Sequence, residues 1–528
     1  MNSIPANFLP QALLRHVSFI AFCLSVVVAS EADSGIKVLS FNGDTGFVHD
    51  SKELAEQMII ELGMQQGWEV STSSDPAVFT DPDLARFDVI VFSNNCGTAS
   101  AIFNAEQQKG FQQYIRSGGG FVGIHCAGAI WHETGDFKEW YEKLIGTTLV
   151  AHPPVQSARL TVEKRNHVST WHLPIHWDVR DEWHRFGYNP RESVHVLISL
   201  DESSYTGKDK MFGDHPISWY QEYDGGRSFF TTLGHTKEIY QVPAYRAHVL
   251  GGIQWAADRF ETIELEPTRK GLVLDLNADK AVMVEDGDRV VRWSNQVQNS
   301  PASDFVKRDE GRAVMGSGRP RLRLQNQEIR FHNTIIFNRQ ELVNHHEDAF
   351  DHLLTGSGYT WLAILAPYTQ VPGLKDVSSF FGNLRNEGNY EGIWGNLADD
   401  NRPWLGSRSG KTFGRFDENN PMIIAERPLE TNRYYLLMGR MGAGTGRVPL
   451  ELYVNQADTP VAKGIFPVSP TANSSKMAIG QERDATNHPG RESFDGELAR
   501  LLIYDRPLSN AELKQSAERL RKDYRILE

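Results

Sequence analysis

Gly118-Gly119-Gly120-Phe121-Val122-Gly123-Ile124-His125-Cys126-Ala127 is the most informative run in this 528-residue chain. Three glycines form a turn, the apolar residues from Phe121 to Ile124 follow, and small residues then return. A glycine turn, a buried strand and a second tight turn are the setting of a nucleophile elbow in α/β enzymes. The run therefore predicts a buried strand that ends in a turn carrying His125 and Cys126.

Strands and helices alternate upstream of this run. Apolar segments at 36–41, 68–70 and 88–92 predict strands, and apolar residues at helical spacing predict helices around 54–62 and 111–115. This β-α-β-α order is typical of an α/β fold with a parallel, doubly wound sheet, as in flavodoxin-like and amidotransferase-like domains. Ligands of such sheets bind beyond the carboxyl ends of the strands.

The pattern changes towards the second half of the chain. Strands are predicted at 194–200, 217–223 and 227–232, the last two as a hairpin, and a helix at 244–257 closes the first domain. From Gly271 onward short alternating strands recur between Gly, Asn and Pro turns, which predicts an all-β two-sheet sandwich. A final helix is expected after Ser509, which begins a capping box.

The start of the chain resembles a secretory signal. Arg15 and His16 precede an apolar run over 17–29, which is shorter than the roughly 20 residues that span a bilayer. We therefore expect a secreted or periplasmic protein with no transmembrane segment in the mature chain. The predicted segments are a signal peptide at 1–30, an α/β domain at 31–262, a linker at 263–270 and a β-sandwich at 271–528.

Composition narrows the function classes. The net charge is −13, from 54 basic and 67 acidic residues, and this balance argues against nucleic acid as a partner. Removal of the signal leaves two cysteines, Cys96 and Cys126. They can form one disulfide in an oxidising compartment, but we favour two buried thiols.

Two histidines occupy positions that resemble the site of class I glutamine amidotransferases. The elbow of those enzymes reads G-x-C-x-G, and in the same frame His125 takes the place of the nucleophile while Cys126 is shifted by one residue. His235 follows a strand, as does the catalytic histidine of that fold. The resemblance implies the fold, whereas the shifted cysteine argues against glutamine hydrolysis.

A closer resemblance extends over residues 36–260. The run above, together with Trp131 and the segments 214–219, 233–236 and 251–256, is similar to the trehalose-utilisation (ThuA-like) family. This resemblance implies a link to disaccharide metabolism, with keto-sugars among the candidate substrates. Asp181-Glu182-Trp183 resembles an acidic and aromatic segment of the same family.

The candidate site residues follow from these positions. His125, His235 and Glu182 are the predicted catalytic residues, with His235 as an acid or base. His125 and His235 are also candidate ligands of a divalent metal. The predicted substrate-binding residues are Asp44, Trp131, His152, Trp183, Asp214 and His215.

The second domain resembles concanavalin A-like (laminin G-like) jelly rolls. Phe494-Asp495-Gly496-Glu497-Leu498 and the strand after it carry this resemblance, as does the opening segment 271–276. The resemblance implies glycan binding. Asp484, Asn487 and Asp495 are candidate calcium ligands, although Asp and Asn are also common turn formers.

Three functions are open at this point. The first is an exported enzyme of the hydrolase or isomerase type that acts on a sugar or keto-sugar and carries a glycan-binding domain. The second is a non-catalytic carbohydrate-binding or adhesion protein, which the loss of the cysteine nucleophile favours. The third is a thiol amidohydrolase that uses Cys126.

Overall fold

The structure is a computed structural model of the chain. It describes residues 35–97, 99–129, 135–307, 316–371, 377–385, 390–409, 423–482 and 492–526. The predicted signal peptide therefore lies outside the described residues. Within these ranges, no helix is both long and apolar enough to cross a membrane.

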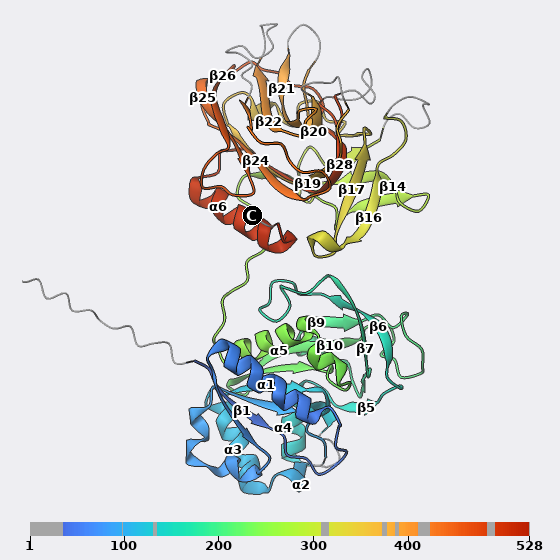
Figure 1. Cartoon of the computed structure of the whole chain (residues 1–528), viewed down its shortest axis with the longest axis vertical. Helices are drawn as coiled ribbons and strands as arrows, with labels where there is room; N and C mark the ends of the chain where they lie inside the picture. The colour runs from blue at the N-terminus through green and yellow to red at the C-terminus, as the bar shows by residue number, and fades with distance from the viewer. Residues whose placement is uncertain are drawn as a thin grey trace, which may run out of the picture.

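The first domain is built on a nine-stranded mixed sheet (Figure 1). Its parallel half contains, in spatial order, β2 (Glu69–Ser73), β1 (Lys37–Phe41), β3 (Val89–Ser93), β4 (Gly120–Ile124) and β11 (Gly226–Thr231). The sheet then continues through antiparallel ladders to β10 (Pro216–Tyr223), β9 (His195–Leu200), β6 (Gln156–Val162) and β7 (His176–Asp181). The predicted α/β fold is thus confirmed, and the antiparallel extension enlarges it.

Helices cover both faces of this sheet, because the strands direct apolar side chains to each face and both faces must be shielded from water. Helices α1 (Lys52–Gln66) and α5 (Pro243–Ala256) pack with Val38 and Val122 on one face. On the other face, α3 (Ala105–Arg116) and α4 (Asp136–Ile145) pack with Phe41 and Phe92. Figure 1 shows α5 and α3 on opposite sides of the sheet. Burial on both faces accounts for the nearly continuous apolar sequence of β3.

The second domain is one large, nearly closed antiparallel sheet, compatible with the predicted β-sandwich. One side consists of β16 (Arg321–Asn326), β17 (His332–Asn338), β28 (Asp495–Tyr504), β19 (Tyr359–Pro367), β24 (Tyr435–Met441), β25 (Gly446–Val454) and β26 (Ala462–Val468). The other includes β18 (Leu342–Val343), β27 (Ala478–Ile479), β20 (Ser378–Gly382), β21 (Glu391–Leu397), β22 (Pro403–Ser409) and β23 (Ile423–Ile424). The two sides are connected by β14 (Arg289–Ser294), which pairs with β16, β13 (Val282–Glu285) and β15 (Asp304–Val306), and by β15, which pairs with β18. β12 (Leu272–Asn277) pairs with β28.

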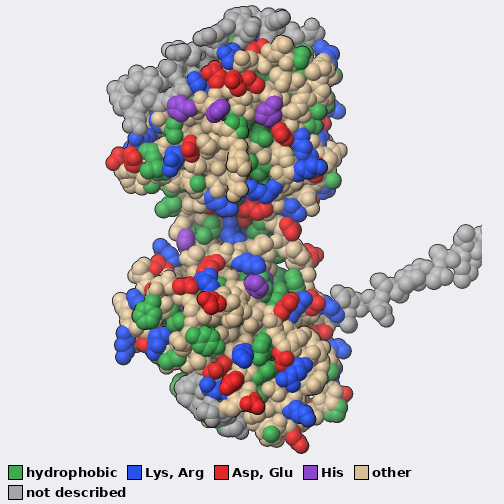
Figure 2. Space-filling model, turned by 180° about the vertical axis from the view of Figure 1, so that it is seen from behind, with side chains coloured by type: hydrophobic (Ala, Val, Ile, Leu, Met, Phe, Trp, Pro, Cys, Tyr) green, Lys and Arg blue, Asp and Glu red, His purple; other side chains and the backbone are tan. Residues whose placement is uncertain are grey.

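The two domains meet through charged and aromatic side chains. The Arg330 guanidinium and the Lys522 ammonium both lie over the ring of Trp171, at 4.9 and 4.5 Å from its centroid. Arg165 of the first domain pairs with Asp523 of the second at 3.1 Å. Acidic and basic side chains gather where the domains meet on the face shown in Figure 2. The contact is therefore polar, unlike either domain core.

The capping box predicted at Ser509 is confirmed at the start of α6 (Asn510–Tyr524). The backbone N–H of Ser509 donates to Glu512 at 3.0 Å, and the N–H of Glu512 donates to the Ser509 hydroxyl at 3.3 Å. Arg506 adds two hydrogen bonds to Glu512 at 2.8 and 2.9 Å. Bonds from Arg506 and from the Ser509 backbone lower the pKa of Glu512 to about 2.

Glu512→Ala is expected to destabilise the second domain by about 1 kcal/mol at pH 7. Because the folded pKa is depressed, this contribution is present above the unfolded pKa of about 4.3 and is lost as the pH falls towards 2. Urea unfolding of wild type and variant across this range measures it. Glu518→Ala, at an exposed position of the same helix, is the control. Equal losses in the two variants would contradict the prediction.

Candidate functional site

Loops at the carboxyl edge of the parallel strands bring the candidate residues together. His125 directly follows β4, and His235 lies four residues after β11. Because these two strands are parallel neighbours, their carboxyl ends lie at the same edge of the sheet. The chain leaving β7 reaches this edge and brings Glu182 and His184 to it.

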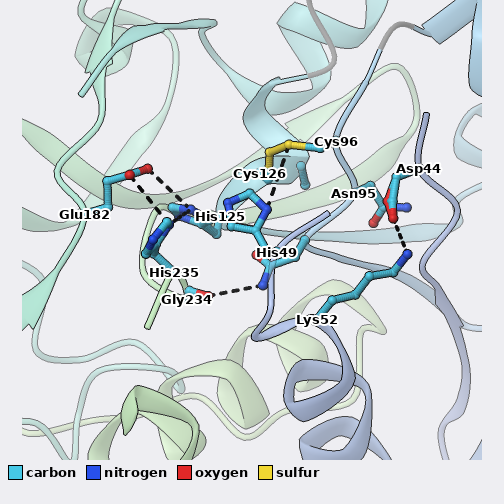
Figure 3. Close-up of a disulfide and its surroundings, with 12 residues drawn as sticks. Asp44, His49, Lys52, Asn95, Cys96, His125, Cys126, Glu182, Gly234 and His235 are labelled. Atoms are coloured by element: carbon cyan, nitrogen blue, oxygen red, sulfur yellow. Dashed lines mark hydrogen bonds and ion pairs between the residues drawn. A yellow bond between two sulfur atoms is a disulfide. The ribbon is translucent and has the colours of Figure 1, made fainter. Parts of the chain in front are cut away.

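The carboxylate of Glu182 lies close to four histidines. Figure 3 labels Glu182 together with two of them, His125 and His235. Oε2 of Glu182 lies 3.6 Å from His125 Nε2 and 3.4 Å from His184 Nε2. Oε1 lies 2.9 Å from His152 Nδ1 and 3.6 Å from His235 Nδ1. The side chains of His125 and His184 are each 1% exposed. Those of His152 and His235 are 47% and 27% exposed. Glu182 therefore has one oxygen facing the interior and one facing the accessible side.

Hydrogen bonds fix the orientation of His125. Its Nδ1 lies 2.7 Å from the carbonyl oxygen of Thr232, which can only accept, so Nδ1 carries the proton. Its Nε2 therefore presents a lone pair, 3.2 Å from Nδ1 of His235. The backbone of His125 is left-handed, with φ at +49°, as expected at a tight turn after a strand.

A fifth histidine, His49, completes the cluster next to a disulfide. Its ring centroid lies 5.0 Å from that of His125 and 5.2 Å from that of His235. Its Nδ1 lies 4.0 Å from the sulfur of Cys96, which is bonded to Cys126 (Figure 3). The two buried thiols favoured from the sequence are therefore wrong. The pairing is possible because the cysteines follow the adjacent strands β3 and β4.

Burial keeps the inner histidines neutral, whereas contacts with histidines keep the glutamate ionised. Burial lowers the pKa of His125 well below its ordinary value and that of His49 to about 4, with neighbouring histidines adding to both effects. For Glu182, burial raises the pKa, but hydrogen bonds from His152 and His184 and the proximity of His125 outweigh it and hold the pKa far below normal. The hydrogen bond to Glu182 raises the pKa of His152 despite partial burial. The buried part of the cluster thus combines neutral imidazoles with one carboxylate.

Two buried residues support the cluster from outside. Asp181 accepts hydrogen bonds from the backbone N–H groups of Gly234, His235 and Thr236 at 2.8, 3.1 and 3.1 Å. His215 places Nε2 2.8 Å from the carbonyl oxygen of His184. Asp181 therefore holds the loop that carries His235, and His215 holds the backbone of His184.

Asp181→Ala is expected to destabilise the first domain by about 2 kcal/mol, because three backbone donors lose a buried acceptor while one buried carboxylate is removed. Asp178→Ala is the matched control on the same strand, since Asp178 is exposed and forms only a surface ion pair with Arg159. Thermal unfolding of both variants measures the difference. A Tm for Asp181→Ala equal to that of Asp178→Ala would show that the loop does not depend on this carboxylate.

The other predicted site residues lie apart from the cluster or outside the described ranges. Asp44 pairs with Lys52, and Asp214 pairs with Arg191 at 2.6 Å. Trp183 is fully buried in the core and donates its indole N–H to the Gln156 carbonyl oxygen at 3.0 Å. Trp131 lies outside the described residues.

The candidate calcium ligands do not form a described site. Asp495 pairs with Arg339 at 3.1 Å, so its carboxylate already has a cationic partner. Asp484 and Asn487 fall outside the described residues.

Sequence reasoning found most of the cluster but missed His49 as a member, and it assigned no role to His184. His49 lies in the loop between β1 and α1, beyond the carboxyl end of a parallel strand. That position was the available signal, because ligands of such sheets gather at this edge. His184 follows a strand that the sequence pattern did not predict.

Three sets of side chains in the described part of the chain place metal-binding atoms within 4.8 Å of one another. They are His49 with Cys96 and Cys126, His49 with His125 and His235, and His125 with Glu182 and His184. The sulfurs of the first set are joined in the disulfide, so they are not thiolate ligands. The other two sets consist of imidazole and carboxylate donors, which suit divalent transition metals.

The fold and site define an α/β domain with a histidine-rich site at the carboxyl edge of its sheet. Residues 37–256 match the family model described as trehalose utilisation (ThuA), so this part of the chain is a ThuA domain. The family description associates the domain with carbohydrate use. No match was found among curated proteins.

Solved structures also resemble parts of the chain. A ThuA-like protein from Bacteroides uniformis is 22% identical, with a TM-score of 0.37, over 43% of this chain and 94% of that one. A ThuA-like protein from Parabacteroides merdae is 18% identical, with a TM-score of 0.36, over 44% and 94%. A Trypanosoma rangeli sialidase in complex with the inhibitor DANA is 14% identical, with a TM-score of 0.29, over 49% and 34%.

Proposed function

We propose that this chain is an exported enzyme that acts on a sugar or keto-sugar through the histidine–glutamate cluster, with a second domain that binds glycans. The observation that carries the proposal is the single carboxylate of Glu182 shared by two buried and two accessible histidines. The trehalose-utilisation description of residues 37–256 supports a carbohydrate substrate.

His235 is suited to act as the base. Its Nδ1 lies between two acceptors, the Nε2 of His125 at 3.2 Å and Oε1 of Glu182 at 3.6 Å. The proton of neutral His235 is therefore on Nδ1, which leaves Nε2 free to accept a proton from a substrate. Glu182 would stabilise the resulting imidazolium, as a carboxylate does beside a catalytic histidine.

A proton carrier beside a buried carboxylate suits proton removal next to a sugar carbonyl or activation of water at a glycosidic bond. These are the steps of an isomerase and of a hydrolase. Substrate would approach from the side of His152 and His235, because these are the accessible members of the cluster.

Turnover by the full chain tests the proposal. Trehalose and keto-sugars derived from it would be incubated with wild-type protein and followed by proton NMR. We expect conversion of at least one of these sugars. Saturable binding of the same sugars without any conversion would instead support the alternative, a non-catalytic carbohydrate-binding protein, and would overturn the enzyme assignment.

A thiol amidohydrolase using Cys126 is not proposed further. Cys126 is bonded to Cys96, so it provides no thiolate nucleophile in this structure.

A further inference from the structure

The inner oxygen of Glu182 has unusual contact distances. Its Oε2 lies 3.6 and 3.4 Å from the Nε2 atoms of His125 and His184, longer than the roughly 2.7–2.9 Å of a charge-assisted hydrogen bond. The outer oxygen differs, because Oε1 lies 2.9 Å from Nδ1 of His152. The inner oxygen thus lies near two imidazole nitrogens, at distances longer than those of a strong charge-assisted hydrogen bond.

Their spacing matches that of ligands on one metal ion. With bonds of about 2.0–2.1 Å in a tetrahedral arrangement, two ligand atoms lie roughly 3.4 Å apart. The two distances from Oε2 are close to this value, and the His125 and His184 nitrogens lie within 4.8 Å of each other.

We propose that His125 Nε2, His184 Nε2 and Glu182 Oε2 bind a divalent transition metal ion, such as Zn²⁺. Two imidazoles and one carboxylate are a ligand set of catalytic zinc sites, in which a fourth position stays open to water or substrate. Around the set, Nδ1 of His125 donates to the Thr232 carbonyl, which is the supporting contact typical of a metal-bound histidine. His215 holds the backbone of His184.

This set is favoured over that of His49, His125 and His235. His235 is 27% exposed, whereas the three proposed ligands are buried. Metal binding at His125 Nε2 would replace the hydrogen bond that this atom accepts from Nδ1 of His235 at 3.2 Å, because a single lone pair serves both. His235 and the outer oxygen of Glu182 would then face the open position and remain available for proton transfer.

The inference deepens the proposed function, but metal binding is measured without any sugar, so the two can fail separately. The full chain, without an affinity tag, would be stripped with a chelator and titrated with Zn²⁺ by calorimetry. Co²⁺ would report the coordination through its visible spectrum. We expect one ion per chain in wild type and a tetrahedral Co²⁺ spectrum.

Variants separate the ligand sets. His184→Ala and Glu182→Gln are expected to weaken Zn²⁺ binding by more than the roughly 10–100-fold typical of losing a supporting contact. His152→Ala removes only a supporting contact of the carboxylate and should weaken binding by no more than roughly 10–100-fold. His195→Ala, an exposed histidine on β9 away from the cluster, is the matched control and should bind as wild type does. His184→Gln replaces His184→Ala if the alanine variant does not fold.

Two results would overturn the assignment. One is the absence of stoichiometric Zn²⁺ binding by wild type. The other is binding that survives His184→Ala but is lost in His49→Ala, which would place the ion in the other set. Metal binding without sugar turnover would leave the site standing and contradict only the proposed function.

Discussion

His235→Ala is expected to lower kcat on a sugar that the wild-type protein converts by roughly 10²–10⁴-fold, the usual contribution of a positioned acid or base. The expectation follows from its place in the cluster: its Nδ1 faces two acceptors, which leaves Nε2 to take the proton. Its partial exposure allows contact with a substrate, whereas His125 is fully buried.

Steady-state kinetics of the variant would measure this loss. His195→Ala is the control, because His195 is an exposed histidine on β9 away from the cluster. KM should change less than kcat if His235 acts in the chemical step. Full activity of both His235→Ala and His125→Ala would show that the cluster is not the catalytic site.

Loss of the disulfide is the second large effect that we expect. Cys96 and Cys126 are separated by 30 residues, and closing a loop of this length stabilises a fold by roughly 3–4 kcal/mol. For a domain of this size, that corresponds to a fall in Tm of about 7–14 °C. His49, which packs against the Cys96 sulfur, should lose its fixed position as well.

Thermal unfolding with and without a dithiol reductant would test this effect. The double variant Cys96→Ser, Cys126→Ser should have a lowered Tm that no longer responds to the reductant. An equal response of wild type and double variant would mean that the reductant acts elsewhere. An unchanged Tm in both would mean that the bond contributes nothing to stability.

The residues of the site were predictable to the extent that they directly follow apolar parallel strands. His125 follows β4, whose five residues are all buried and which is visible in sequence as an apolar run. β11, before His235, is buried at five of its six residues but has the sequence Gly-Arg-Ser-Phe-Phe-Thr, and it was predicted as one half of a hairpin. Glu182 was found differently, through its resemblance to a family segment.

Other residues had no comparable signal. β7, which leads to Glu182 and His184, has the sequence His-Trp-Asp-Val-Arg-Asp and is half exposed, so its apolar pattern is weak. The disulfide could have been inferred, because both cysteines lie a few residues beyond the ends of neighbouring strands. Several strands of the second domain pair with partners distant in sequence, as β19 does with β28, and local patterns do not reveal such pairing.

The left-handed backbone at His125 makes the site a burden on the stability of the fold. A residue with a β-carbon in this conformation costs roughly 1–2 kcal/mol, a cost that glycine does not incur. Glycine would relieve that backbone cost, but it would also lose the bond to the Thr232 carbonyl and leave a cavity among the neighbouring rings. A buried histidine held in a strained turn is what a residue shaped for chemistry looks like in the backbone.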